Sequence, residues 1–252
     1  MLTEKHPFEP FLPDGAKILF LGSFPPQPHR WSMHFYYPNW ANDFWRVMGL
    51  IHFGERNYFC VPGEKRFDEA AIRAFCSAQG LAFYDTAGEV RRLKNNASDA
   101  FLEVVTPTDV PGLLAHLPLC GTVVTTGQKA TEVLSETFQC EVPPLGGYVE
   151  VRIGPRTLRF WRMPSTSAPI RSLWRKKPRC IAVFSPDVPC EVSRILGHLP
   201  QKRPILVEVS VFSGHLTHPP WRKLQKIVIS AVCARCSYCY AADSDAVQIS
   251  GQ

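Results

Sequence analysis

The sequence contains no apolar run long enough to cross a lipid bilayer, which takes about 20 consecutive apolar residues. It has no internal repeat and no low-complexity tract, so a repeat architecture is excluded. Its first residues, MLTEKHPFEPFLPDG, lack the basic-then-apolar order of a secretory signal peptide, and we expect a cytoplasmic protein. The nine cysteines are an odd number in a chain of ordinary size, which argues against the disulfide framework of a secreted domain.

Charge is scarce and unevenly placed. Only 20% of the 252 residues are charged and 45% are apolar, which is typical of a globular protein with one α/β core, or one core and a small appendage. Residues 1–167 carry 16 Lys and Arg against 17 Asp and Glu, a net charge of −1, whereas residues 168–252 carry 12 against 5, a net charge of +7. If a nucleic acid is the partner, residues 1–167 must bind it through local geometry, and their net charge contributes only weakly to binding.

Short apolar runs alternate with amphipathic segments over residues 17–163, and these patterns predict strands and helices respectively. Asn42 is a candidate N-cap, Pro111 is tolerable in a first turn, and Gly80 is suited to end a helix. Alternating strands and helices predict a mostly parallel sheet with helices on both faces, a three-layer α/β/α fold. The expected strands are 17–22, 81–85 and 121–126 with a hairpin of 148–153 and 157–163, and the expected helices are 42–49, 68–79, 108–117 and 127–138.

Ligands of such sheets bind beyond the carboxyl ends of the strands. Four segments fall there, and each has small, turn-forming or polar residues directly after an apolar run. We call them the four bends: residues 22–26, 84–86, 126–129 and 164–167. The pattern predicts that the four bends converge on one ligand site, and the alternative is four ordinary turns.

The loop of residues 25–40 is rich in aromatic side chains. Trp31, Phe35, Tyr36, Tyr37 and Trp40 fall within ten residues of one another, beside the end of a predicted strand. Their rings are suited to stack on a base pulled out of a duplex, but they are equally suited to form a hydrophobic flap over the sheet edge. The sequence leaves both interpretations open.

Two of the bends carry polar groups with more than one possible use. The bend at 164–167, Pro-Ser-Thr-Ser, offers hydroxyls and backbone donors that suit a phosphate or a groove, although a simple Ser/Thr turn is the alternative. Asp85 ends a predicted strand, where it is placed either to hydrogen-bond a ligand edge or to cap a turn.

Five segments of the chain resemble, in order, the uracil-DNA glycosylase superfamily. They are Gly-Ser-Phe-Pro-Pro at 22–26, Phe-Tyr-Tyr-Pro-Asn-Trp-Ala-Asn-Asp-Phe-Trp at 35–45, Tyr-Asp at 84–85, Thr-Gly-Gln-Lys-Ala at 126–130 and Arg-Met-Pro-Ser-Thr-Ser at 162–167. The sequence is most similar to bacterial uracil-DNA-glycosylase-like proteins with a Gly-Ser-Phe-Pro-Pro start, and it also resembles the hypoxanthine-DNA glycosylase branch. The resemblance extends over residues 10–167.

This resemblance implies a four-stranded, mainly parallel sheet and a monofunctional DNA glycosylase of base excision repair. Such an enzyme flips a deaminated base of the uracil or hypoxanthine class out of DNA and hydrolyses its N-glycosidic bond. The implied partner is DNA containing that base, and the protein is expected to act as a monomer, with no cofactor, metal ion or membrane. Two alternatives stay open: a non-catalytic relative that binds damaged DNA, and a small-molecule nucleoside hydrolase.

In the hypoxanthine-directed branch, an asparagine before x-Phe-Trp carries catalysis, and it corresponds to Asn42. Its carbonyl oxygen can hold a water molecule, also while the residue caps a helix, and Asp43 is an alternative with a full charge. Two further sets of site residues are expected. The base-binding set is Ser23, Phe24, Pro25, Tyr36, Tyr37, Tyr84 and Asp85, and the DNA-binding set is Gly127, Gln128, Lys129, Pro164, Ser165, Thr166 and Ser167.

Two positions depart from the pattern of the resembling family. Phe24 stands where many relatives have Asp or Asn, and a phenyl ring can stack on a base but cannot orient a water molecule. Met163 stands where many relatives have His or Asn, and methionine cannot donate a hydrogen bond to the leaving base. Both departures favour the non-catalytic alternative.

The chain changes character after residue 167. We therefore expect a glycosylase-like domain over 1–167 and an atypical basic segment over 168–252, which lacks the lysine-containing closing helix of the resembling family. One hypothesis is that the segment is read in a shifted frame. Cys233, Cys236 and Cys239 have C-x2-C-x2-C spacing, which suits part of an iron–sulfur site completed by Cys180 or Cys190, but we favour chance spacing because such sites show complete ligand sets.

Overall fold

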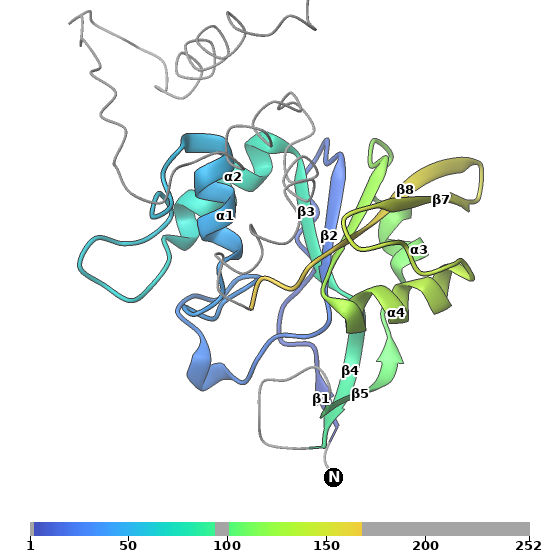
Figure 1. The fold of residues 1–252 in the computed structure, drawn as a ribbon, viewed down its shortest axis with the longest axis horizontal. Helices are drawn as coiled ribbons and strands as arrows, with labels where there is room; N and C mark the ends of the chain where they lie inside the picture. Colours follow the sequence, from blue (N-terminus) through green and yellow to red (C-terminus); the bar gives the residue numbers. More distant parts are fainter. Residues whose placement is uncertain (1–2, 94–100, 168–252) are drawn as a thin grey trace, which may run out of the picture. The chain divides into compact units, whose positions relative to one another are not determined.

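The computed structural model describes residues 3–93 and 101–167 (Figure 1). Its main sheet has five strands: β3 (Leu81–Asp85), β2 (Ile18–Gly22), β6 (Thr122–Thr126), β8 (Arg156–Met163) and β7 (Tyr148–Ile153), in that spatial order. The first four are parallel to one another, and β7 pairs antiparallel with β8. The predicted parallel sheet is therefore confirmed, and β7 of the predicted hairpin adds a fifth strand at one edge.

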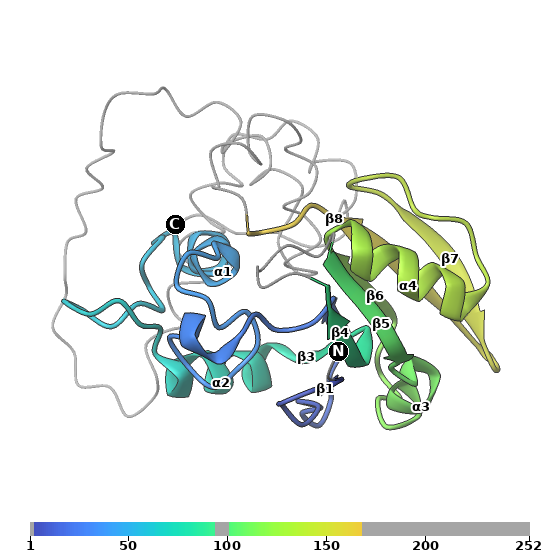
Figure 2. The ribbon, with the colours of Figure 1, turned by 90° about the horizontal axis from the view of Figure 1, so that it is seen from below.

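Side chains of β2 alternate between two hydrophobic layers. Ile18 and Phe20 pack with residues of α1 (Phe44–Phe53) and α2 (Glu69–Gln79). Leu19 and Leu21 pack with residues of α3 (Val110–Ala115) and α4 (Gln128–Phe138). Figure 2 shows the two pairs of helices on opposite sides of the sheet, so the predicted three-layer arrangement is confirmed. Each such fully buried side chain contributes about 1.5–3 kcal/mol.

Local capping signals explain where α2 begins and ends. The Asp68 carboxylate accepts a hydrogen bond from the backbone N–H of Ala71 at 3.0 Å, which satisfies one free donor of the first turn. Gly80 follows the helix with a φ of 66°, a left-handed conformation that glycine adopts without steric cost. The predicted helix over 68–79 is confirmed, with Asp68 as its cap.

Removing this cap should have a small and purely structural effect. Asp68→Ala is expected to lower the free energy of unfolding by about 1 kcal/mol, because it leaves the Ala71 N–H without its acceptor. Urea unfolding measures this change. A variant as stable as the wild type would show that the cap contributes nothing.

A second, smaller sheet was not predicted. It contains β1 (Glu4–Lys5), β4 (Ala87–Arg92) and β5 (Leu102–Pro107), in the antiparallel order β1-β4-β5. Two register shifts interrupt the pairing of β4 with β5, so the period-two pattern that marks a strand is broken there. Only Thr86 separates β3 from β4, and this sheet therefore begins directly at the carboxyl end of β3.

Two findings concern the chain as a whole. None of the helices within 3–93 and 101–167 is long and apolar enough to span a membrane. The predictions for the later segment, namely the domain boundary after residue 167, the shifted frame and the spacing of its cysteines, lie outside the described residues.

Candidate functional site

The four bends lie together at the carboxyl ends of the parallel strands. The Thr86 backbone N–H and hydroxyl both donate to the Gly22 carbonyl, at 2.9 and 3.1 Å, which joins the first two bends. The Gly127 N–H donates to the Met163 carbonyl at 2.9 Å, which joins the last two. Because β2 also pairs with β6, the two pairs of bends are neighbours. The four bends are therefore neighbours as predicted, and the single ligand site that they are predicted to form stays a prediction.

Tyr37 links the aromatic loop to this edge of the sheet. Its hydroxyl shares a hydrogen bond of 2.8 Å with the Thr126 hydroxyl, and its ring stacks on Phe44 with centroids 3.8 Å apart. Its φ of 54° lies in the left-handed region, which costs a residue other than glycine about 1–3 kcal/mol. Burial raises the pKa of Tyr37, so the hydroxyl stays protonated and remains both donor and acceptor. This strained, fixed placement fits a site residue.

Asp85 occupies the space that Gly22 leaves open. The aspartate is buried at the end of β3, and its Oδ1 lies 2.5 Å from the position that a Cβ on residue 22 would take. The Tyr37 hydroxyl lies 3.9 Å from that same position. A glycine is therefore needed at the end of β2 for the carboxylate to lie beside it, and Asp85 and Tyr37 face the same point of the chain.

His6 contacts the candidate site, which the sequence did not reveal. Its Nε2 lies 2.8 Å from Asp85 Oδ2, and both side chains are almost completely buried. Pairing of Lys5 with Glu89 in the small sheet brings this segment to the end of β3 from a distant part of the chain. A single histidine with no surrounding motif gives no signal of such a long-range contact, and only the unpredicted β1–β4 pairing explains it.

Asn42 and Asp43 precede α1, which begins at Phe44 rather than at the predicted residue 42. Asn42 is half-buried and lies one residue before the N-cap position of α1, which Asp43 occupies, so its prediction as the N-cap is wrong. Its Oδ1 nevertheless accepts a hydrogen bond from the Phe44 N–H at 2.9 Å. Asp43 is buried, and its Oδ1 lies 3.2 Å from Arg56 and 3.6 Å from Arg46. Two guanidinium groups therefore offset the charge of Asp43, whereas a second lone pair of the Asn42 carbonyl oxygen remains available for a water molecule.

The bend at 164–167 lies against the start of α1. The Asp43 N–H donates to the Thr166 carbonyl at 3.0 Å. The Ser165 and Ser167 hydroxyls are 2.6 Å apart and the Ser167 N–H also faces Ser165, which is the Ser/Thr turn considered as an alternative. The Thr166 hydroxyl is buried and has no hydrogen-bond partner within the described ranges.

The aromatic loop is largely a hydrophobic flap. Tyr36 is 3% exposed and its hydroxyl donates to the Glu9 carbonyl at 2.9 Å, so it is a core residue and is not presented to a base. Phe35 is equally buried, and the Trp31 indole donates to the Pro26 carbonyl at 2.6 Å. Two of the predicted base-stacking side chains in this loop therefore hydrogen-bond to a bend: Trp31 to Pro26, and Tyr37 to Thr126.

The first bend packs mainly against the small sheet. Phe24 is half-buried among Ala87, Val90 and Leu102, and the Arg92 guanidinium lies 5.5 Å from its ring centroid. The neighbouring predictions also have local partners: the Ser23 carbonyl accepts from the Ala87 N–H at 3.3 Å, the Pro25 carbonyl accepts from Arg92 at 2.7 Å, and half-buried Tyr84 lies 4.6 Å from the His6 ring. Phe24 is thus packed as a structural side chain, and Met163 is fully buried in the core.

The third bend forms the beginning of α4. Gly127 has a φ of 95° and occupies the N-cap position, Gln128 is exposed and donates to Glu132 at 2.7 Å, and Lys129 is half-buried. The free N–H groups of a helix start attract anions, so the placement is compatible with a phosphate contact.

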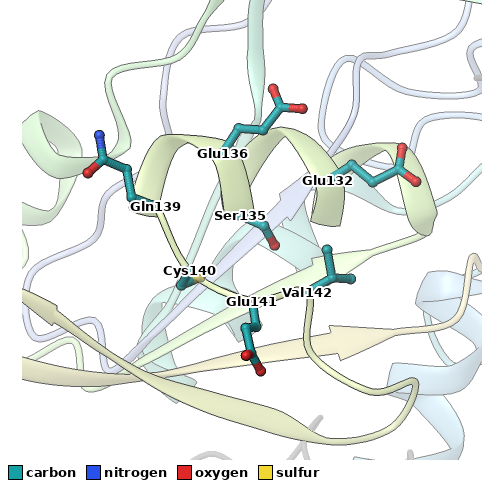
Figure 3. Close-up of a pocket in the computed structure, with 7 residues that line it drawn as sticks. All are labelled: Glu132, Ser135, Glu136, Gln139, Cys140, Glu141 and Val142. Atoms are coloured by element: carbon teal, nitrogen blue, oxygen red, sulfur yellow. The ribbon is translucent and has the colours of Figure 1, made fainter.

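A cavity lined by described residues lies at the other end of α4. It measures about 530 Å³ and is lined by Glu132, Ser135, Glu136, Gln139, Cys140, Glu141 and Val142 (Figure 3). The cavity is therefore separate from the four bends, one of which forms the start of α4. Its glutamates would also repel the phosphate backbone of a nucleic acid. Within the described part of the chain, no three His, Cys, Asp or Glu side chains are grouped to hold a metal ion.

No family model and no curated protein matches this chain. Among solved structures, it is similar to the solution NMR structure of "a putative Uracil DNA glycosylase" from Methanosarcina acetivorans, with 21% sequence identity and a TM-score of 0.49. The similarity covers 78% of this chain and 100% of that one. At this identity and TM-score it identifies neither an activity nor a substrate of this chain.

Proposed function

We propose that this chain is a monofunctional DNA glycosylase that hydrolyses the N-glycosidic bond of a deaminated base, of the uracil or hypoxanthine class, in base excision repair. The proposal rests on the ordered motifs and on the place where their residues meet. The hydrogen bond from the Asp43 N–H to the Thr166 carbonyl carries it. Through this bond, the segment that holds Asn42 adjoins the bend at 164–167, which belongs to the expected DNA-binding set.

The reaction requires a positioned water molecule, cleavage of the bond to the base, and stabilisation of the departing base. The Asn42 carbonyl oxygen accepts a hydrogen bond from a water molecule and turns the water's lone pair toward the sugar carbon. As the water oxygen bonds to that carbon, the bond to the base breaks and its electron pair leaves with the base. The Tyr37 hydroxyl, Ser165 and nearby backbone N–H groups are the donors available to stabilise that base, and a proton released by the water completes the products.

A non-catalytic DNA-damage-binding protein is the second candidate. The burial of Met163 and the two arginines beside Asp43 favour it, because they leave fewer polar groups for bond cleavage. Free nucleosides are less suitable substrates, because they would not use the bend at 164–167 as a duplex contact.

One assay separates these functions. Duplexes that contain uracil, hypoxanthine or xanthine are incubated with the protein and then treated with alkali, which breaks DNA at an abasic site. Strand breaks at the modified base support the glycosylase. Retention on the modified duplex without breaks supports the binding protein and overturns the proposed activity, and cleavage of free nucleosides alone supports a nucleoside hydrolase.

A further inference from the structure

Strand β7 forms one edge of the main sheet, and its outer side has no backbone partner in the described part of the chain (Figure 2). Its six residues, Tyr148–Ile153, all pair with β8 without a register shift. At the opposite edge, Phe11 exchanges two backbone hydrogen bonds with Phe83 of β3, at 3.0 and 2.9 Å. Proteins protect open edges with proline, lysine or a bulge, and β7 has none of these. The open edge is therefore suited to pair with another strand.

The turn between β7 and β8 decides which backbone groups of β7 point outward. It consists of Gly154 and Pro155, and Gly154 has a φ of 58°. Proline does not adopt a positive φ, so this is a type II′ turn, in which a hydrogen bond joins the two flanking residues. Hydrogen-bonded and non-hydrogen-bonded pairs alternate along an antiparallel ladder. The backbone groups that face away from β8 therefore belong to Tyr148, Glu150 and Arg152.

The other end of the same ladder has the same phase. There the Arg162 N–H donates to the Gly147 carbonyl at 3.0 Å, so an odd-numbered residue again faces β8. The side chains of even-numbered Glu150 and Arg152 are exposed, whereas odd-numbered Val151 is buried against the layer of α3 and α4. The outward backbone groups of β7 thus include those of two exposed residues with opposite charges.

Antiparallel pairing of β7 with β7 of a second copy matches these charges. Two copies paired in this way are related by a two-fold axis. With Val151 on the axis, Glu150 of each copy lies opposite Arg152 of the other, and these are the positions whose backbone groups point outward. On the opposite face, half-buried Val149 lies opposite Ile153 of the second copy. Moving the axis by one residue would place Glu150 opposite Glu150, or Arg152 opposite Arg152, and like charges directly opposite are destabilising.

We propose that the outer side of β7 is an interaction surface for a second copy of this chain, with Val151 on the two-fold axis. The main sheet then continues from one copy into the other. The parallel strands of the two copies run in opposite directions, so their carboxyl ends, with the four bends, lie at opposite edges of the joined sheet. This differs from the monomer that the family resemblance implies, and it does not depend on the proposed function.

Sedimentation equilibrium of the full chain measures the association. One strand is a small contact beside the about 1,600 Å² of a standard interface, so we expect a reversible dimer between about 1 µM and 1 mM protein. Glu150→Arg and Arg152→Glu each replace two attractive pairs by two repulsive ones, and each should weaken dimerisation by on the order of 10-fold or more.

The matched controls are Glu136→Arg and Lys65→Glu. They make the same two changes of charge at exposed positions outside β7 and should leave dimerisation as in the wild type. Circular dichroism and thermal unfolding establish that every variant is folded, which is expected because all four side chains are exposed.

A mixture of the two weakened variants tests the register. When Glu150→Arg protein pairs with Arg152→Glu protein, a positive side chain faces a negative one at both positions. The equimolar mixture should therefore dimerise about as well as the wild type, although each variant alone does not. The double variant Glu150→Arg, Arg152→Glu exchanges the charges within one chain and should also dimerise like the wild type.

Recovery in the mixture and in the double variant supports the inference, whatever the base-release assay shows. A wild type that stays monomeric over the whole concentration range overturns it. So does a dimer that both charge reversals leave unchanged, because the contact then lies elsewhere. A mixture that dimerises no better than the separate variants overturns the register with Val151 on the axis, and the proposed pairing with it.

Discussion

Asn42→Ala is expected to slow release of the deaminated base by about 100-fold or more. The proposed role of Asn42 is to hold the attacking water through its carbonyl oxygen, and positioned groups that assist proton transfer contribute on the order of 10²- to 10⁴-fold. Alanine removes the carbonyl group. Single-turnover cleavage of the duplex that the wild type cuts best, followed by alkali, measures the loss.

The same substitution also removes a hydrogen bond at the start of α1. Asn42 Oδ1 accepts from the Phe44 N–H, so Asn42→Ala should cost about 1 kcal/mol of unfolding free energy in addition to activity. Asp68→Ala is the control, because it too removes a side-chain acceptor of a backbone N–H at the start of a helix. We expect similar destabilisation in both variants and loss of activity only in Asn42→Ala. Activity in Asn42→Ala within a few-fold of Asp68→Ala would exclude Asn42 from the chemistry.

The main sheet could be predicted because its signals are local. An apolar run such as Ile18–Gly22 is buried on both faces and is recognisable from composition alone, and the helices that follow carry their own start and stop residues. The small sheet could not be predicted for the opposite reason. β1 has two residues and β4 is irregularly paired, so both depend on contacts made across the fold.

For the candidate site, the location could be predicted from the sequence, but the contacts of its side chains could not. Its location follows from the rule that parallel strands place their carboxyl ends at one edge, and the four bends obey it. The partners of each side chain do not follow from any local rule. The hydrogen bond of buried Tyr36 to Glu9 spans 27 positions and the contact of Arg56 with Asp43 spans 13. The contact of His6 with Asp85 spans 79 positions. Sequence motifs therefore identify the sheet edge that carries the candidate site. Which of the predicted side chains are instead buried in the core can be seen only from the tertiary contacts.

Gly22→Ala is expected to disrupt this edge of the sheet, because the new methyl group would lie 2.5 Å from Asp85 Oδ1. Either the buried carboxylate moves away from His6 or the end of β2 shifts, and overpacking of this kind costs about 1–3 kcal/mol. Base release should fall with it, because Asp85 belongs to the expected base-binding set. Urea unfolding and single-turnover cleavage measure the two effects.

The chain offers a matched control in Gly121, which immediately precedes β6. A Cβ there meets no atom within 4 Å, and its backbone is not left-handed, so Gly121→Ala should leave stability and activity nearly unchanged. The double variant Gly22→Ala, Asp85→Ala tests the cause. If the clash with the carboxylate is responsible, removing Asp85 frees space for the methyl group, and the two substitutions will cost less stability together than the sum of their separate effects. Strict additivity, or a Gly22→Ala variant indistinguishable from Gly121→Ala, would mean that the carboxylate is not fixed beside Gly22.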